Sequence, residues 1–262
     1  MDNSNVRELQ LKKFTREEAT EVSDIVAAEI PFTIFFNHQE IVTLLCTPSY
    51  LKELGVGFLQ SEGFIKNKND ILFIHLDDQR GSINVITEGE SKIALNTLGK
   101  RAVTSGCGKG TIFYNVIDSL YCKDNQIEMY LEPQQIYKLM HTLQHGANLF
   151  LETGGTHSAA LSDGNEMIIL REDIGRHNAI DKIFGECLLN DSDLSEKVIL
   201  TSGRISSEIV IKLAKRSVPI VISCSAPTGL AVELAQKTGI TLIGFTRGEK
   251  MNVYTNDWRI KT

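Results

Sequence analysis

The sequence predicts an α/β fold in which a parallel carboxy-terminal sheet follows a smaller α+β subdomain. Three short apolar runs in the last third are typical of buried strands, namely KVILTSG, PIVISCS and TLIGFTRG. The stretches between them, RISSEIVIKLAKRS and PTGLAVELAQKTG, carry the period of helices. Strands that alternate with helices are joined by right-handed crossovers into a parallel sheet. Ligands of such sheets bind beyond the carboxyl ends of the strands.

The first half of the chain is predicted to combine hairpins with one helix. Residues 32–36 and 41–46 are rich in β-formers and flank a polar turn, which predicts a hairpin. Thr47 suits an N-cap and Pro48 the first helical position, so a helix is expected from there to about Ile65. Two further strand pairs are expected, and a glycine-rich loop lies within the second: ILFIHL with SINVIT, and RAVTSG with TIFYNV.

The pattern changes near residue 130, because a helical period begins after Glu132 and runs to the glycine pair at 154 and 155. A hairpin around Asp163 and Gly164 and a helix beginning near Gly175 are expected next. We therefore divide the chain into a polar lead-in over 1–28, an amino-terminal α+β subdomain with the Cys107 loop over 29–130, and a carboxy-terminal cofactor-binding α/β subdomain over 131–262. The lead-in is expected to be either flexible or an edge element, with little function.

The composition is that of an ordinary globular chain of 262 residues with a formal net charge of -6. This charge gives no overall attraction for nucleic acid or an anionic membrane, so neither is expected as a partner. The amino terminus lacks the apolar core of a signal peptide, and no apolar run approaches the roughly 20 residues of a membrane span. We therefore expect a cytoplasmic protein. The five cysteines include no C-x-x-C pair, which argues against a disulfide framework and a zinc ribbon.

Three polar loops are predicted at the carboxyl edge of the parallel sheet, over residues 201–204, 223–228 and 245–250, and they are expected to face one another. Each offers hydroxyls, a glycine or a cation, and the first two precede helices whose amino termini attract anions. For any one loop, the simpler interpretation is that Ser202 or Thr228 caps a helix and that the arginines form surface ion pairs. The three loops together favour a site for a phosphate or pyrophosphate.

A second polar cluster, EDIGRHN over residues 172–178, lies where a predicted strand meets a predicted helix. Asp173 can cap the helix and His177 can be the satisfied partner of a carboxylate, and a ligand role is an equal alternative. For His157, the same two alternatives of a structural role and a ligand role remain. Because triads are set by space and not by chain order, a cysteine hydrolase built from Cys107, His177 and Asp173 also stays open.

Cys107 is the thiol that the sequence marks for chemistry. It lies in SGCGKG, whose glycines leave it reachable and able to move. No acidic residue occurs over 91–117, whereas the basic residues there are Lys92, Lys100, Arg101 and Lys109. Such a field favours the thiolate, the form that attacks a persulfide or binds a metal. The alternative, a buried structural cysteine, fits poorly because glycines build no apolar wall.

The other thiols are weaker candidates. Cys46 and Cys187 lie in apolar surroundings typical of a core, and Cys122 has no evident helper. Cys224 is a rival because it lies at the carboxyl edge beside the anion loops, although a cysteine at a strand end more often serves packing. A zinc deaminase is not indicated, since residues 38–40 match only the H-x-E half of its motif and the P-C-x-x-C half is absent.

Seven segments, in order from Thr47 to Thr255, resemble the FdhD family of formate dehydrogenase accessory sulfurtransferases: TPSYLKELGVGFLQSEGFI, TSGCGKG, GGTHSAAL, EDIGRHNAIDKIFGE, SGRISSE, SAPTGLAVELA and GFTRGEKMNVYT. The resemblance covers most of the chain, and the EDIGRHNAIDK stretch is too long and unusual for chance similarity. The resemblance implies a layered α/β fold similar to that of cytidine deaminases, without their zinc, and it implies a homodimer.

The resemblance also implies a function. Members of the family take persulfide sulfur from a cysteine desulfurase onto a loop cysteine and transfer it to molybdenum in bis-molybdopterin guanine dinucleotide, before formate dehydrogenase receives this cofactor. Carried onto this sequence, the sulfur carrier is Cys107. The cofactor-binding segment is Phe245, Thr246, Arg247, Gly248, Glu249 and Lys250. Guanosine diphosphate is the expected mimic of the cofactor, and no metal ligand is expected in the chain itself.

The sequence departs from the family pattern at one place. Many members carry two cysteines in a C-x-x-C loop, and here Gly110 stands where the second would be, or in the other register Thr104 replaces the first. We prefer the first register, because Thr104 and Ser105 then precede the cysteine as in the family. Without a resolving thiol, a Cys107 persulfide is expected to discharge directly onto molybdenum. The alternative function is a non-catalytic cofactor chaperone, which would tolerate loss of Cys107.

Overall fold

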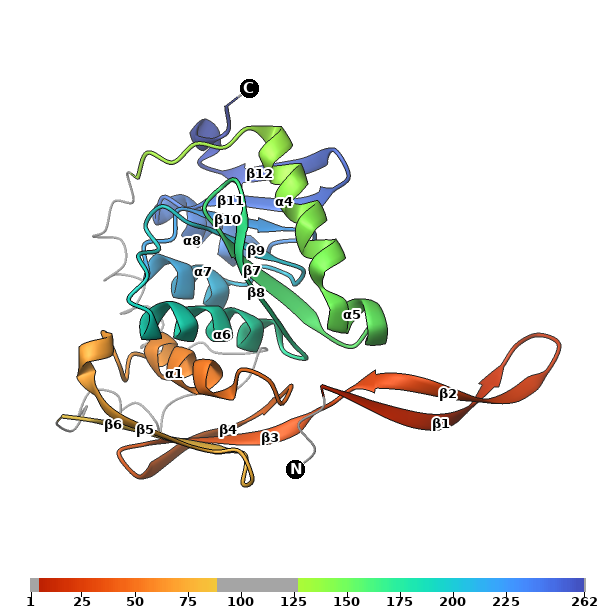
Figure 1. Ribbon diagram of the computed structural model, residues 1–262. Helices are drawn as coiled ribbons and strands as arrows, with labels where there is room; N and C mark the ends of the chain where they lie inside the picture. Colours follow the sequence, from red (N-terminus) through yellow and green to blue (C-terminus); the bar gives the residue numbers. More distant parts are fainter. Residues whose placement is uncertain (1–4, 89–126, 262) are drawn as a thin grey trace.

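The computed structural model describes residues 5–88 and 127–261 (Figure 1). The predicted Cys107 loop, the strands expected on either side of it and Cys122 lie outside the described residues. No helix of the described part is both long enough and apolar enough to cross a membrane. Two larger sheets and one small one are present, and helices lie between and around the larger ones (Figure 1).

The carboxy-terminal half contains a six-stranded sheet in the order β12-β11-β10-β9-β7-β8. Its strands are β7 (His157–Ser162), β8 (Met167–Asp173), β9 (Val198–Thr201), β10 (Ile220–Ser223), β11 (Thr241–Arg247) and β12 (Lys250–Thr255). The predicted parallel arrangement of β9, β10 and β11 is confirmed. Strands β7, β8 and β12 run antiparallel to their neighbours, so the whole sheet is mixed.

Strand β12 was not predicted, and it changes the interpretation of residues 245–250. The sequence pattern assigned these residues to a loop that leaves the third parallel strand. In the structure β11 continues to Arg247, and β12 begins at Lys250 and pairs with it. The segment is therefore the tip of a β-hairpin, and backbone pairing holds both of its sides in place.

Helices cover both faces of this sheet. They are α6 (Arg176–Leu189), α7 (Ser207–Ala214) and α8 (Gly229–Lys237) on one face, and α4 (Pro133–Gly146) with the short α5 (Asn148–Thr153) on the other (Figure 1). The strand side chains alternate accordingly, because Ile199 packs among α6 to α8 while Val198 and Leu200 pack against α4. The predicted helix after Glu132 is thus present, but it breaks in two at Ala147.

The amino-terminal subdomain is a four-stranded sheet in the order β4-β3-β6-β5, covered by one helix. Its elements are β3 (Ile30–Phe36), β4 (Gln39–Cys46), α1 (Leu51–Glu62), the 3-10 helix η1 (Lys68–Asp70), β5 (Ile71–Asp77) and β6 (Ser82–Thr87). The predicted hairpin and the strand pair that follows the helix are confirmed. Every second residue of β3 points into an apolar core beneath α1, namely Phe32, Ile34 and Phe36.

Helix α1 begins later than the sequence predicted. Thr47 is no N-cap, because the helix starts at Leu51 after Tyr50, which adopts the left-handed conformation. The Thr47 hydroxyl is used elsewhere, since it contacts Asp173 and Lys182 in the other half of the chain. A tertiary contact has thus taken the side chain that local capping rules would place at the start of the helix.

The two halves are joined through close contact between α1 and α6. A Cβ atom added at Gly57 of α1 would lie 1.8 Å from the carbonyl oxygen of Asp181. A Cβ added at Gly185 of α6 would lie 1.9 Å from the carbonyl oxygen of Glu53. The backbones of the two helices therefore touch at two glycines. Leu188 of α6 also packs into the amino-terminal core.

The first residues form a hairpin of their own. Strands β1 (Val6–Phe14) and β2 (Ala19–Ala27) pair with each other in a separate two-stranded sheet, which projects from the body of the molecule (Figure 1). The lead-in predicted for this region is therefore regular structure, and it is not an edge of either larger sheet within the described residues. At the other end, the 3-10 helix η2 (Asp257–Arg259) returns the chain to Leu131, with which Ile260 forms a β-bridge. The layering expected from cytidine deaminases stays a prediction.

Candidate functional site

The topology of the six-stranded sheet gathers five chain segments at one edge. The carboxyl ends of β9, β10 and β11 lie there because these strands are parallel. Strand β7 is antiparallel to β9, so it begins at the same edge with His157. Strand β8 runs in the direction of β9 and ends there at Asp173, followed by the amino terminus of α6. We call this set of strand ends the carboxyl edge.

The three predicted loops contact one another at the carboxyl edge. Ser223 Oγ donates to the carbonyl oxygen of Gly203 at 2.8 Å. The backbone N–H of Phe245 donates to the carbonyl oxygen of Ser225 at 3.1 Å. An isolated parallel bridge joins Ile205 to the loop after β10. The loops after β9, β10 and β11 therefore form one continuous surface, as the sequence predicted.

Two residues of the hairpin 245–250 have unusual environments. Phe245 is 42% exposed and has a φ of 53°, a left-handed conformation that non-glycine residues rarely adopt. Thr246 is fully buried, and its hydroxyl has no hydrogen-bond partner within the described part of the chain. Buried hydroxyls are almost always paired, so an unpaired one calls for an explanation. A hydrogen-bonding ligand at the carboxyl edge would supply one.

The hairpin also places two cations side by side. Arg247 and Lys250 are directly opposite each other in the β11 and β12 pair, so their side chains lie on the same face. Both are exposed, and neither forms an ion pair with another described residue. The Arg247 Nε donates to the carbonyl oxygen of Cys224 at 3.0 Å, which fixes the guanidinium over the neighbouring loop. Like charges placed opposite each other repel, and a bound anion would relieve that repulsion.

Cys224 lies between the hairpin and the loop after β9. Its thiol is half-buried and lies 3.4 Å from the carbonyl oxygen of Ser202. Burial raises the pKa of the Cys224 thiol, and the positive charge of Arg247 opposes this only in part. Cys224 is therefore mainly protonated at neutral pH and is a poor nucleophile.

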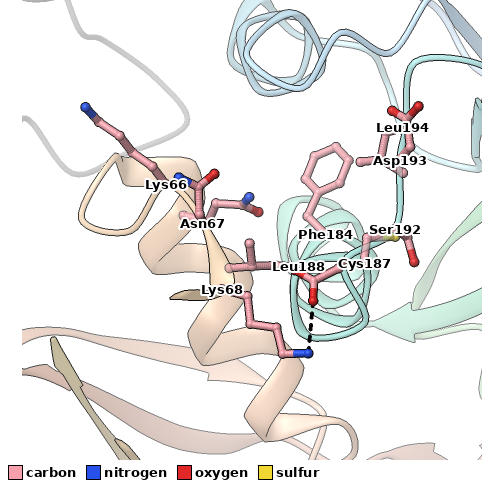
Figure 2. A pocket seen from close by; sticks show the side chains of 11 residues that line it. Lys66, Asn67, Lys68, Phe184, Cys187, Leu188, Ser192, Asp193 and Leu194 are labelled. Carbon is pink, nitrogen blue, oxygen red and sulfur yellow. Dashed lines mark hydrogen bonds and ion pairs between the residues drawn. The ribbon is translucent and has the colours of Figure 1, made fainter. Parts of the chain in front are cut away.

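The other two described thiols are core residues, as predicted. Burial raises the pKa of Cys46 to about 12, and the negative charge of Asp173 contributes in the same direction. Burial likewise raises the pKa of Cys187 to about 11. Cys187 borders a cavity of about 280 Å³ between η1 and the end of α6, next to the exposed ion pair of Lys68 and Asp191 (Figure 2). The cavity lies away from the carboxyl edge and carries charges of both signs at its mouth.

Asp173 of the EDIGRHN cluster has a structural role. Its side chain is fully buried and lies 2.7 Å from the Nζ of Lys182. The backbone N–H and the hydroxyl of Thr47 both donate to its Oδ2 at 3.1 Å. Its Oδ1 accepts from the backbone N–H of Gly175 and from the side-chain amide of Asn178, each at 2.9 Å. The carboxylate is satisfied on both oxygens, which leaves no acceptor for a catalytic role.

His177 is also engaged within the protein. Its Nε2 lies 3.3 Å from a carboxylate oxygen of Glu208. Burial, followed by the positive charges of Lys212 and Arg176, lowers the pKa of His177 from 6.5 to about 4. The imidazole is therefore neutral at pH 7, so its contact with Glu208 is not an ion pair. The hydrogen-bond partner of its Nε2 among the described residues is the Ser206 hydroxyl, at 3.4 Å.

The hydrolase triad left open by the sequence is not assembled in the described residues. Asp173 pairs with Lys182 and His177 contacts Glu208, and no hydrogen bond joins Asp173 to His177. The third member, Cys107, lies outside the described residues together with Arg101 and Lys109. Two of the three positions therefore lack the mutual geometry that a triad requires.

Lys182 was not singled out from the sequence, although a signal was present. It lies in α6 among Ala179, Ile180, Ile183 and Phe184, all of which are buried. A lysine within such an apolar stretch is almost never buried without a partner. The pattern therefore indicates a buried ion pair, but the identity of its partner depends on the tertiary fold.

Comparison with known proteins gives a consistent result. A model of the FdhD/NarQ family matches residues 27–261. A relative from Bacillus subtilis, named sulfur carrier protein FdhD, is 41% identical over 249 residues, which cover 95% of each chain. A relative of the same name from Staphylococcus aureus is 42% identical over 238 residues, covering 91% of this chain and 90% of the relative.

The fold is also similar to a solved structure. A crystal structure of a candidate formate dehydrogenase accessory protein from Desulfotalea psychrophila superposes with a TM-score of 0.81 at 26% sequence identity. The match covers 98% of this chain and all of the other. The arrangement of sheets and helices described above is therefore shared with that protein.

Proposed function

Because the chain belongs to the FdhD/NarQ family, whose relatives above are named sulfur carrier proteins, we propose that it carries persulfide sulfur on Cys107 and delivers it to a molybdenum cofactor. The donor is a cysteine desulfurase and the acceptor is the molybdenum of bis-molybdopterin guanine dinucleotide, which is cargo and not a resident cofactor. The recipient of the sulfurated cofactor is formate dehydrogenase. The protein acts in the cytoplasm as a homodimer.

The environments of the three described thiols support Cys107 as the sulfur carrier. Three of the five cysteines lie in the described residues, and burial raises the pKa of each of them. A protonated, buried thiol attacks a persulfide slowly. Cys107 differs because its surrounding sequence is rich in glycine and basic residues and lacks acidic ones. It is therefore the thiol best suited to hold a reactive thiolate.

The carboxyl edge suits the cargo. The cofactor carries guanosine diphosphate arms, and diphosphates bind to arginine forks, lysine ammonium groups and hydroxyls. The hairpin 245–250 offers Arg247 and Lys250, which form no ion pair with a described residue, and the Thr246 hydroxyl, which has no hydrogen-bond partner among residues 5–88 and 127–261. Gly248 at the turn has a φ of 56°, and no atom of another described residue lies within 4 Å of the place of a Cβ, so a ligand can approach its backbone closely.

Sulfur transfer needs no second thiol in this chain. The terminal sulfur of a Cys107 persulfide would pass to molybdenum as the S–S bond breaks and the Cys107 thiolate is released. The transferred sulfur takes up two electrons to become a sulfide ligand, and the molybdenum of the cargo, in its reduced state, would supply them. Lys109 and Arg101 stabilise that thiolate and the anionic persulfide. Gly110 occupies the place of a second loop cysteine, so no internal disulfide competes with this step.

Intact-protein mass spectrometry after incubation with a cysteine desulfurase and cysteine tests the carrier assignment. We expect the wild type and Cys224→Ala to gain the mass of one sulfur atom, and Cys107→Ala to gain none. Loss of the gain only in Cys224→Ala would mean that Cys224 is the carrier. Absence of any gain in the wild type would favour a chaperone that shelters the cofactor without carrying sulfur.

Binding of guanosine diphosphate tests the second half of the proposal. Arg247→Glu is expected to weaken binding by at least tenfold, because it removes a charge-assisted contact and adds a repulsive one. Persulfide loading on Cys107 should be unchanged in this variant. Equal loss of both properties would point to misfolding, which the thermal unfolding curve of the variant would reveal.

A further inference from the structure

The carboxyl edge carries a second group of basic side chains at the end opposite to the hairpin 245–250. Strand order places β11 first, then β10, β9, β7 and β8. His157 begins β7, Arg176 follows β8 and Arg204 follows β9. Neighbouring strands are about 4.8 Å apart, so the strand ends that carry this group lie two to four strands, roughly 10 to 19 Å, along the edge from the end of β11. The two groups are therefore carried by different strand ends of the same edge.

Arg176 has the most unusual surroundings of the three. A Cβ added at Gly203 would lie 2.9 Å from the Cβ of Arg176, so the absence of a side chain at Gly203 makes room for the arginine. The Nε atom of Arg176 is buried and has no hydrogen-bond partner among residues 5–88 and 127–261. A buried guanidinium donor without a partner is rare in native proteins. It indicates an acceptor that is not part of the described chain.

Arg204 reinforces the positive field around Arg176, and His157, which is neutral at pH 7, offers a hydrogen-bonding ring nitrogen. Arg204 is exposed and forms no ion pair with a described residue. Two hydrogen bonds of 2.9 Å between Ser158 and Ser202 hold the start of β7 beside the loop after β9, which Arg176 contacts at Gly203. Burial, followed by the positive charges of Arg176 and Arg204, lowers the pKa of His157. Asp173 acts in the opposite direction, but Lys182 neutralises it at 2.7 Å. Glu208 of α7 contacts His177, the residue after Arg176, at 3.3 Å, and the two arginines against this one carboxylate leave the cluster net positive.

Hydrogen-bond donors surround these cations. Helix α6 is 14 residues long, and its N-cap, Gly175, has no side chain to cap it. The first backbone N–H groups of such a helix point outward and favour anions. The Ser202 hydroxyl, in the adjacent loop, accepts a hydrogen bond from the backbone N–H of Ser158 and keeps its own proton available for donation.

We propose that Arg176, Arg204 and His157, together with the amino terminus of α6, form a second phosphate-binding subsite at the carboxyl edge. It takes a diphosphate group separate from the one bound at the hairpin 245–250. This inference rests on the proposed function, because a cargo with two guanosine diphosphate arms supplies two diphosphates. The two subsites then divide the cargo, one at each end of the same edge.

Isothermal titration calorimetry of the full-length protein with guanosine diphosphate, and separately with inorganic pyrophosphate, tests the proposal. The wild type is expected to bind two equivalents of either probe. Arg204→Gln should lose one of them, or bind it at least tenfold more weakly, and Arg247→Gln should lose the other. The double variant should bind neither. Arg80→Gln, on the exposed surface of the amino-terminal subdomain, is the matched control for loss of one positive charge and should behave as wild type.

Two outcomes would overturn the subsite. One is unchanged binding of both probes in Arg204→Gln, and the other is loss of all binding in Arg247→Gln alone. Arg204 is exposed, so its substitution is not expected to affect folding, and an unfolding curve equal to that of the wild type would confirm this. If pyrophosphate binds with dependence on Arg204 while guanosine diphosphate does not bind, the subsite stands and the proposed cargo is wrong. If neither probe binds the wild type, both proposals fail.

Discussion

Asp173 and Lys182 form an ion pair in which both side chains are fully buried and the Nζ to Oδ2 distance is 2.7 Å. The pair joins the end of β8 to the middle of α6, and Thr47 connects it to the segment that follows β4. It therefore holds the two subdomains together directly behind the carboxyl edge. The strand end that leads to Arg176 depends on this connection.

Removing one partner of this pair is expected to destabilise the protein strongly. Lys182→Met leaves the Asp173 carboxylate buried without its cation, which typically costs about 3 to 5 kcal/mol. The free energy of unfolding in guanidinium chloride measures the effect. The double variant Asp173→Asn with Lys182→Met should recover a large part of the loss, because no unpaired charge is then buried.

Lys68→Met is the matched control for that experiment. Lys68 pairs with Asp191 at 3.1 Å, but the two side chains are 46% and 66% exposed. Exposed pairs contribute about 0 to 1 kcal/mol, so this variant should unfold nearly as the wild type does. Equal effects of the two lysine substitutions would contradict the role given to the buried pair.

The glycine contacts between α1 and α6 lead to a second prediction. Gly57→Ala and Gly185→Ala each place a methyl group less than 2 Å from a carbonyl oxygen of the facing helix. The helices must then separate, and we expect each variant to lose about 1 to 3 kcal/mol or more. Gly229→Ala is the control, because within the described part of the chain no neighbouring atom lies within 4 Å of its Cβ position. The control should be neutral or slightly stabilising, since alanine favours helices.

Local pattern predicted the parts of the fold in which burial and periodicity agree. The parallel strands β9 and β10 are fully buried, and their short apolar sequences, VILT and IVIS, are rich in β-branched residues that favour strands. Strand β12 was missed although its exposure alternates, because the turn-like residues before it were read as one loop. The first hairpin was missed because neither of its faces is buried, so its sequence shows no apolar alternation.

The candidate site was predicted in its position but not in its internal connections. Parallel topology alone brings the loops after β9, β10 and β11 together, so their contact could be inferred from strand order. The roles of Asp173 and Thr47 could not, because their partners lie on the other side of the subdomain boundary. Whether a polar residue serves a ligand or the fold depends on such distant partners.

Acid is expected to weaken the folded state through His177. Its pKa is about 4 in the folded protein and near 6.5 when exposed, so the unfolded chain binds more protons between these values. Stability is therefore fully present above pH 6.5 and falls as the pH drops towards 4, by at most about 3 kcal/mol. The pKa of His157 is also lowered, so it contributes in the same direction.

Urea unfolding at several pH values between 4 and 7.5 measures this dependence. His177→Gln should show a smaller slope over that window, because its side chain does not titrate. Carboxylates with lowered pKa values, such as Asp70 and Asp163, lose their contribution only below about pH 4, outside this window. A His177→Gln variant with an unchanged slope would refute the assignment.

The described thiols are expected to resist alkylation in the folded protein. At pH 8 a thiol of pKa about 12 is ionised to roughly one part in ten thousand, so Cys46 should react with iodoacetamide only after denaturation. Cys187 should behave in the same way, because its pKa is about 11 and it is 2% exposed. Peptide mass mapping before and after addition of urea distinguishes the sites. Rapid labelling of either residue in the native state would contradict the burial described here.

Thr246 offers a test in which stability and binding change in opposite directions. Its hydroxyl is buried and has no partner in the part of the chain that the structure describes, so Thr246→Val replaces an unsatisfied polar group with a methyl group of similar size. We expect the unfolding free energy to rise by about 1 kcal/mol, since leaving a buried hydroxyl unpaired costs about that much or more. If the hydroxyl serves the cargo, affinity for guanosine diphosphate should fall at the same time by about fivefold to tenfold.

Thr255→Val is the control, because the Thr255 hydroxyl donates to the carbonyl oxygen of Ile240 at 2.7 Å and its loss should reduce stability. A Thr246→Val variant that is less stable than the wild type would show that the hydroxyl has a partner within the protein, and its role in binding would then be lost.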